Sequence, residues 1–271
     1  MEKRTVFMIS DGTGITVESL SNSLISQFES IQFEKRVFPF ADSIAKIEAI
    51  CNEIEQFSEK SPLKPLVFMT LVNPDIGACI KQTSACVFDL FDTFLSPLEE
   101  ELGIKASDTV GRAHAADSAS YDQRIDAVNY ALAYDDGIKI HGYEQADMIL
   151  VGVSRCGKTP SCLYMALQFG IFAANYPFTM DELSHHQLPE ILQPFRSKLF
   201  GLTIDPIRLQ SIRSERRPNT AYSSFEQCRR EVQEAELMYQ REKIPYLDST
   251  HFSIEEIATK IMSIAKIKRR I

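Results

Sequence analysis

Near its middle the chain contains the octapeptide Gly152-Val153-Ser154-Arg155-Cys156-Gly157-Lys158-Thr159. This octapeptide fits the pattern G-x-x-x-x-G-K-[ST] at every fixed position. In such a loop the glycines let successive backbone N–H groups turn toward phosphate oxygens, and the positive end of the following helix faces the same anion. Lys158 would place its ammonium group on the outer phosphates, and the Thr159 hydroxyl would bind Mg²⁺. We therefore predict that all eight residues bind a nucleotide diphosphate, that Lys158 is catalytic and that Thr159 is a metal ligand.

The sequence on both sides of this 152–159 loop fits the same interpretation. Residues 146–151 form an apolar run typical of a buried strand, and apolar side chains recur at helical spacing over residues 160–170. A strand, a glycine-containing turn and a helix, in this order, are the context in which the pattern holds phosphate. We therefore expect the segment to be the nucleotide site of a P-loop kinase-like domain that performs phosphoryl transfer.

Asp205 is a second candidate for the catalytic site. It follows the apolar strand expected over residues 198–204, a position at which P-loop proteins often hold a carboxylate directed at Mg²⁺ or acting as a base. Asp205 also precedes Pro206, and aspartate before proline is typical of a helix N-terminus, where the carboxylate caps backbone N–H groups. The sequence leaves both roles open.

Four arginines follow Asp205, namely Arg208, Arg213, Arg216 and Arg217. The segment over residues 216–223 is polar, contains proline and resembles a mobile lid. Arginines on a closing lid would neutralise charge on a transferred phosphoryl group, so Arg213 and Arg217 are candidate catalytic residues. The alternative is a solvated helix face without a chemical role.

A second strand-to-helix turn lies at Ser10-Asp-Gly-Thr-Gly14. Backbone N–H groups at the start of the following helix would make it an anion site by the same argument as above. The segment is too short to be specific, and an ordinary tight turn explains it as well.

Short apolar strands alternate with amphipathic helices along the chain, which favours mainly parallel sheets covered by helices on both faces. The expected strands comprise residues 5–9, 33–38, 66–72, 146–151, 171–174, 198–204 and 245–248. The expected helices comprise residues 17–28, 44–57, 76–102, 121–132, 160–170 and 225–242, with a last helix opened by the capping box of Ser253 and Glu256. No internal repeat is visible. We predict an α/β protein with an N-terminal α/β domain over residues 1–140 and a P-loop domain over residues 141–271.

The composition argues against several classes of function. The 271 residues carry a formal net charge of -8, which disfavours a broad nucleic-acid or anionic-membrane surface. No apolar run approaches the roughly 20 residues of a membrane span, and the N-terminal residues lack the pattern of a signal peptide. The six cysteines show no C-x-x-C spacing, so neither disulfides nor a zinc site is expected. We expect a cytoplasmic protein that binds neither nucleic acid nor a membrane.

Six segments together are similar to a known protein family. They are Ile9-Ser-Asp-Gly-Thr13, Tyr134-Asp-Asp-Gly137, Gly152-Val-Ser-Arg-Cys-Gly-Lys-Thr-Pro160, Ala173-Ala-Asn-Tyr-Pro-Phe178, Leu199-Phe-Gly-Leu-Thr-Ile-Asp-Pro206 and Ile257-Ala-Thr-Lys-Ile261. With these motifs the sequence resembles the regulatory proteins of phosphoenolpyruvate synthase, a group related to the regulators of pyruvate, phosphate dikinase. The resemblance covers nearly the whole chain, and the interior of the 152–159 loop is more similar to the synthase branch.

The resemblance implies a bifunctional enzyme, a serine/threonine kinase and phosphorylase. Members of the family use ADP to phosphorylate an active-site threonine of their target enzyme, which inactivates it. They remove that phosphate with inorganic phosphate as co-substrate, which releases pyrophosphate. The resemblance further implies that the 152–159 loop binds ADP, that phosphoenolpyruvate synthase is the target and that the protein is a homodimer. ADP as donor, and the synthase rather than pyruvate, phosphate dikinase as target, depend on the resemblance alone.

The residues by themselves leave two other interpretations open. A small-molecule P-loop kinase would share the strand, loop, helix and arginine-rich segment, although such a kinase would not need the first 140 residues. A nucleotide-sensing module would bind ADP without chemistry, and Asp205 and the arginines would then be structural.

Overall fold

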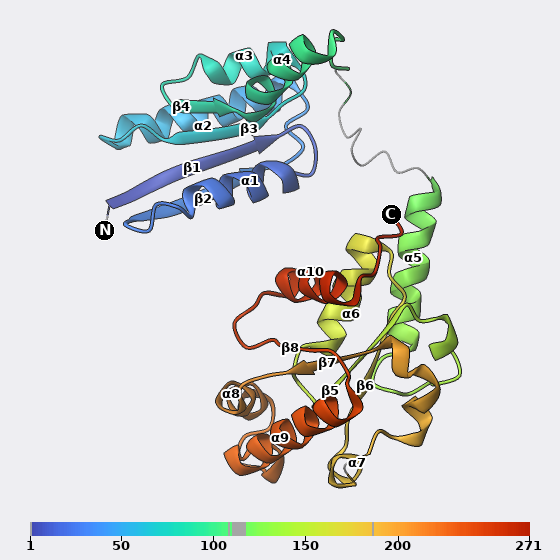
Figure 1. Ribbon diagram of the computed structural model, residues 1–271. Helices are drawn as coiled ribbons and strands as arrows, with labels where there is room; N and C mark the ends of the chain where they lie inside the picture. Colours follow the sequence, from blue (N-terminus) through green and yellow to red (C-terminus); the bar gives the residue numbers. More distant parts are fainter. Residues whose placement is uncertain (1, 108, 110–117, 186) are drawn as a thin grey trace. The chain divides into compact units, whose positions relative to one another are not determined.

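Strand–helix alternation produces two separate sheets, one in each half of the chain (Figure 1). The computed structural model describes residues 2–107, 109, 118–185 and 187–271, and the chain divides into the units Met1–Ala115 and Ala116–Ile271. Each unit contains one four-stranded sheet in which all neighbouring strands are parallel. The predicted α/β fold is thereby confirmed.

The boundary between the units lies earlier in the chain than the expected residue 140. Helix α5 (Ser118–Ala133) packs against α6 (Lys158–Phe169) and β6 (Ala173–Pro177), so it belongs to the second unit. Buried Ala127 and Tyr130 of α5 join the core of that unit. The helical spacing of Tyr121, Ile125, Val128 and Leu132 predicted this helix, but Tyr121, Ile125 and Leu132 are exposed. The spacing therefore indicated neither the face that packs nor the sheet that it covers.

The first unit has the sheet order β2-β1-β3-β4. Its elements are β1 (Glu2–Ser10), α1 (Ile15–Ile25), β2 (Ile31–Phe38), α2 (Ile44–Lys60), β3 (Leu66–Thr70), α3 (Pro74–Lys81), β4 (Cys86–Asp89) and α4 (Leu90–Leu102). Alternate side chains of β1 enter two different cores. Phe7 and Ile9 pack with α2 and α3, whereas Val6 and Met8 pack with α1 and α4. Burial on both faces explains why residues 6–9 of this strand are all apolar.

Strand β4 was not expected, since the sequence predicted helix throughout residues 76–102. The strand has four residues, pairs with β3 from Leu66 opposite Cys86, and lies at the edge of the sheet. Phe88 stacks on Phe68 with ring centroids 4.9 Å apart, yet it remains 43% exposed. A strand this short and this exposed has too few apolar positions to show a period of two.

The second unit has the sheet order β6-β5-β7-β8. After α5 its elements are η1 (Tyr143–Gln145), β5 (Met148–Gly152), α6, β6, α7 (Met180–Ser184), η2 (Glu190–Lys198), β7 (Leu199–Thr203), α8 (Pro206–Arg216), η3 (Ala221–Ser223), α9 (Phe225–Glu242), β8 (Tyr246–Asp248) and α10 (Ile254–Ala265). Helices α5 and α10 contact α6, while α7 and α8 contact α9, so two helical layers enclose the sheet (Figure 1). The predicted capping box of Ser253 and Glu256 is present at α10.

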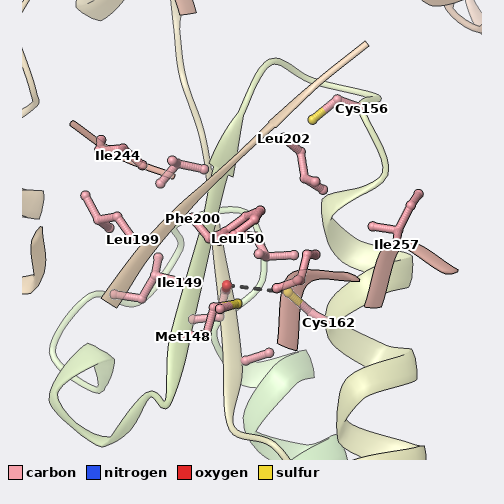
Figure 2. Close-up of a cluster of buried hydrophobic side chains, with 14 of the residues drawn as sticks. Met148, Ile149, Leu150, Cys156, Cys162, Leu199, Phe200, Leu202, Ile244 and Ile257 are labelled. Carbon is pink, nitrogen blue, oxygen red and sulfur yellow. Dashed lines mark hydrogen bonds between the residues drawn. The ribbon is translucent and has the colours of Figure 1, made fainter. Parts of the chain in front are cut away.

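The core of the second unit surrounds β5, all five residues of which are buried. Figure 2 shows Leu150 of β5 and Leu202 of β7 in one apolar cluster with Ile257 of α10. The hydroxyl of Tyr239, on α9, lies 3.1 Å from the carbonyl oxygens of both Val151 and Leu202. This contact fixes the end of β5 at the point where the 152–159 loop begins.

The two sheets share one strand order. In each unit the first strand of the sheet lies between the second and the third, and the fourth strand follows at the edge. The turn at residues 10–14 therefore follows the first strand of its sheet just as the 152–159 loop follows β5. The sequence shows no repeat that corresponds to this shared topology.

Three further observations concern membranes, metals and thiols. Within the described residues, no helix is both long enough and apolar enough to span a bilayer. The same residues include no group of three or more histidine, cysteine, aspartate or glutamate side chains placed to hold a metal ion. All six cysteines lie in the described part of the chain and are free thiols.

Candidate phosphate-binding site

The backbone of the 152–159 loop turns sharply between β5 and α6. Three of its residues have positive φ angles, Gly152 at 154°, Arg155 at 77° and Gly157 at 96°. Gly157 caps the N-terminus of α6 without a side-chain hydrogen bond, and the first turn of α6 contains no acidic residue. An anion in the loop would therefore meet the positive end of a 12-residue helix whose N-terminus has no side-chain cap.

Gly152 is required by a close approach of two backbones. A Cβ atom at this position would lie 2.5 Å from the carbonyl oxygen of Leu202. We expect Gly152→Ala to lower the free energy of unfolding by about 1–3 kcal/mol, because neither backbone can move without disturbing the sheet. Urea denaturation monitored by circular dichroism measures this change. Gly157→Ala is the matched control, since a Cβ there has no neighbour within 4 Å and adds only backbone strain. A Gly152→Ala variant as stable as the wild type would contradict this loop conformation.

Lys158 lies inside the loop. Its side chain is only 4% exposed, and Nζ donates hydrogen bonds to the carbonyl oxygens of Gly152 at 3.1 Å and Val153 at 2.8 Å. These two bonds hold the ammonium group against the curled backbone. A phosphate bound by the loop N–H groups would meet a cation that is already in position.

Thr159 contacts a carboxylate that the sequence did not identify. Its Oγ1 donates a 2.8 Å hydrogen bond to Oδ1 of Asp135, which follows the C-terminal end of α5. The same Oδ1 accepts a hydrogen bond from Nδ2 of Asn175, a fully buried residue of β6. Sequence reasoning assigned Asp135 and Asp136 to the end of a helix. The signal that could have identified Asp135 was a pair of adjacent carboxylates within a segment shared with the resembled family.

Arg213 supports the loop from the protein interior. Its side chain is 0% exposed and its Nη2 donates to the Ser154 carbonyl at 3.1 Å and to Oε2 of Glu231 at 2.6 Å. The guanidinium carbon also lies 4.2 Å from the ring centroid of Tyr222, whose hydroxyl is 3.0 Å from Ser154 Oγ. The expected contact of Arg213 with a transferred phosphoryl group would require this buried ion pair to open.

The other candidates after β7 lie at the surface. Asp205 is exposed and caps α8, accepting hydrogen bonds from the backbone N–H groups of Ile207 at 2.9 Å and Arg208 at 3.0 Å. The structure thus realises the helix-cap role, one of the two alternatives. Arg217 is the exposed residue at the C-terminal end of α8, and the segment after it contains the 3-10 helix η3.

Cys156 is a buried thiol despite its place in the loop. It is 1% exposed and its sulfur points into the apolar core near Leu202 (Figure 2). Burial raises the pKa of the Cys156 thiol, so the nucleophilic thiolate is scarce at neutral pH. The hydroxyl of Ser249 lies 3.0 Å from the Cys156 carbonyl and fixes this part of the loop to the end of β8.

The turn at residues 10–14 lines a cavity of about 530 Å³ in the first unit, beside the carboxyl ends of β1, β3 and β4. Two polar side chains of the turn, those of Ser10 and Asp11, accept hydrogen bonds within the unit. Ser10 Oγ accepts from Gly12 N at 3.2 Å, and Asp11 accepts from Val72 N at 2.7 Å. Unlike the 152–159 loop, the turn contains no lysine.

Comparison with known proteins identifies the family of this chain. The family described as Kinase/pyrophosphorylase matches residues 6–262. The chain is 62% identical over 270 residues to a protein of Legionella pneumophila (strain Corby), covering 99% of this chain and 100% of the relative. It is 54% identical to a protein of Hahella chejuensis and 53% identical to one of Ectopseudomonas mendocina, each over 99% of both chains. All three relatives bear the name "Putative phosphoenolpyruvate synthase regulatory protein". The chain therefore belongs to the kinase/pyrophosphorylase family.

Proposed function

We propose that this protein transfers the β-phosphoryl group of ADP to an active-site threonine of phosphoenolpyruvate synthase and removes that group by phosphorolysis. The observation that carries the proposal is the 152–159 loop, in which the buried ammonium group of Lys158 is held against the curled backbone at the N-terminus of α6. Membership of the kinase/pyrophosphorylase family and the names of the relatives support the reaction type and the target.

The two reactions need one anion site used in two directions. In the forward reaction the threonine oxygen attacks the β-phosphorus of ADP, the bond to AMP breaks, and the hydroxyl proton passes to a base. In the reverse reaction an oxygen of inorganic phosphate attacks the phosphothreonine phosphorus, which forms pyrophosphate and returns the threonine. The protein contributes position and positive charge, the main requirements of phosphoryl transfer. Lys158 is proposed to stabilise the charge on the transferred group in both directions.

The donor set at Thr159 fits a magnesium ion. A threonine hydroxyl beside a carboxylate provides the hard oxygen ligands that Mg²⁺ prefers, with phosphates and water completing its coordination. When bound, Mg²⁺ would neutralise phosphate charge. We further propose that exposed Arg217 contributes positive charge to the site from the end of α8, and that Asp205 at the start of α8 serves as cap or base. We also propose that the protein works as a cytoplasmic homodimer.

A labelled-transfer assay tests the proposed function. The protein is incubated with phosphoenolpyruvate synthase and ADP labelled in its β-phosphate, and the acceptor is identified by mass spectrometry. We expect label on a threonine of the synthase, and its release as labelled pyrophosphate after addition of inorganic phosphate. Pyruvate, phosphate dikinase in a parallel reaction decides between the two targets. Label only on small molecules would favour a small-molecule kinase, and ADP binding without transfer would favour a nucleotide-sensing module.

A further inference from the structure

Asp135 reaches the phosphate end of the loop from a distant part of the sequence. It precedes Thr159 by 24 positions, yet its Oδ1 lies 2.8 Å from the Thr159 hydroxyl. Thr159 is the second residue of α6, so this hydroxyl lies where the loop N–H groups would hold phosphate. A carboxylate therefore borders the position at which a nucleotide-bound metal ion would meet the protein.

Asn175 holds the carboxylate in place. Its buried side chain donates from Nδ2 to Asp135 and accepts at Oδ1 from the backbone N–H of Asp136 at 3.2 Å. The backbone of Asn175 pairs with the same segment, since its N–H donates to the Tyr134 carbonyl at 3.3 Å and its carbonyl accepts from Gly137 at 3.1 Å. Four hydrogen bonds to one residue of β6 thus fix residues 134–137 beside α6. The position of Asp135 is preorganised rather than adjustable.

The partners of Asp135 distinguish it from an ordinary structural carboxylate. Among the described residues, the groups that donate to Asp135 are the side chains of Thr159 and Asn175, and both are uncharged. A capping carboxylate such as that of Asp205 instead accepts from the backbone N–H groups at a helix start. Asp135 is half-buried, and among the described residues no ion pair within 4.0 Å balances its charge. A divalent cation would supply that balance.

We propose that Asp135 is the carboxylate that directs Mg²⁺ to the 152–159 loop, acting together with the Thr159 hydroxyl and positioned by Asn175. Mg²⁺ is usually bound through one or two carboxylates plus substrate phosphates, which matches this pair of groups. The inference deepens the proposed function, because it requires that the loop binds the nucleotide.

The test measures binding, so it does not depend on turnover. The Kd of ADP is determined by isothermal titration calorimetry with Mg²⁺ and again with EDTA, for the wild type and for Asp135→Asn. The substitution keeps an oxygen that can accept from Thr159 and removes the charge. We expect the wild type to bind ADP more tightly with Mg²⁺, and Asp135→Asn to lose about 10–100-fold in affinity with Mg²⁺ but little with EDTA. Asp122→Asn, on the exposed face of α5, is the matched control.

Two further variants separate a metal role from a folding defect. Thr159→Val removes the hydroxyl and keeps the shape, and we expect it to lose the same advantage of Mg²⁺ over EDTA. In the double variant Asp135→Asn with Thr159→Val the two losses should not add, because both groups act through one ion. Thermal unfolding of each variant confirms that it is folded.

Each outcome supports or overturns the assignment. An Asp135→Asn variant with the wild-type response to Mg²⁺ would overturn it and leave the proposed function intact. Equal loss of ADP affinity with Mg²⁺ and with EDTA would also overturn it, since Asp135 would then only maintain the loop. A wild-type protein that binds no ADP under either condition would refute the proposed function itself, and the assignment with it.

Discussion

Lys158→Ala is expected to abolish both transfer from ADP and phosphorolysis, with a loss of at least about 100–1,000-fold in each direction. Removal of one preorganised charged donor from a catalytic site typically costs this much. Both reactions should fail together, because one ammonium group serves the transferred phosphoryl group in either direction. The measurements are single-turnover transfer from labelled ADP and release of labelled pyrophosphate. The Lys158 side chain is only 4% exposed, so contacts inside the protein, rather than solvent, hold its ammonium group in position.

Folding must be checked in this variant, since alanine removes the donor to the Val153 carbonyl and one of the two donors to the Gly152 carbonyl, which still accepts from the Phe178 N–H. Circular dichroism and the urea midpoint provide that check, and Lys268→Ala, at an exposed position, is the matched control for loss of one positive charge. If folded Lys158→Ala lost transfer but retained phosphorolysis, the two activities would need separate anion sites.

Arg213→Met is expected to lower the free energy of unfolding by about 3–5 kcal/mol, the cost of leaving one partner of a buried ion pair alone. Glu231 is only 8% exposed and would keep a negative charge with no cation beside it. The Ser154 carbonyl would lose its donor in the same variant, so ADP affinity should fall as well. Urea denaturation and ADP calorimetry measure the two effects separately.

The double variant Arg213→Met with Glu231→Leu tests the cause. Replacing both partners by apolar groups removes the isolated charge, so it should recover most of the lost stability. ADP affinity should remain low, since the Ser154 carbonyl still lacks its donor. A double variant no more stable than Arg213→Met would show that packing of the arginine, rather than its charge pair, stabilises this region.

The sequence predicted those features that depend on neighbouring residues. The 152–159 loop was recognisable because its glycines, lysine and threonine occupy fixed positions within eight residues, and β5 and α6 flank it as their periodicity predicted. The last helix began at its predicted capping box for the same reason. Local pattern and local structure coincide where the backbone supplies most of the contacts.

Features set by distant contacts were not predictable in this way. In the sequence, Arg213 is one of several arginines in a polar segment, and nothing sets it apart because its partner Glu231 lies 18 positions further along the chain. The sequence indicated only that Asp135 lies at the end of a helix, since nothing near it shows that Asn175 of β6 holds its carboxylate beside Thr159. Packing against β6 likewise decides that α5 belongs to the second unit. Packing between elements that are distant in the sequence decides all three, and a single sequence does not record it.

The shared strand order of the two sheets gives their first turns equivalent places. In both sheets the first strand lies between the second and the third, and doubly wound sheets bind ligands outside the carboxyl ends of the strands at such a point. The turn at residues 10–14 and the 152–159 loop each follow the first strand of their own sheet. Both following helices have threonine as their second residue, Thr16 in α1 and Thr159 in α6, but only α6 begins with a lysine, so the lysine distinguishes the two turns.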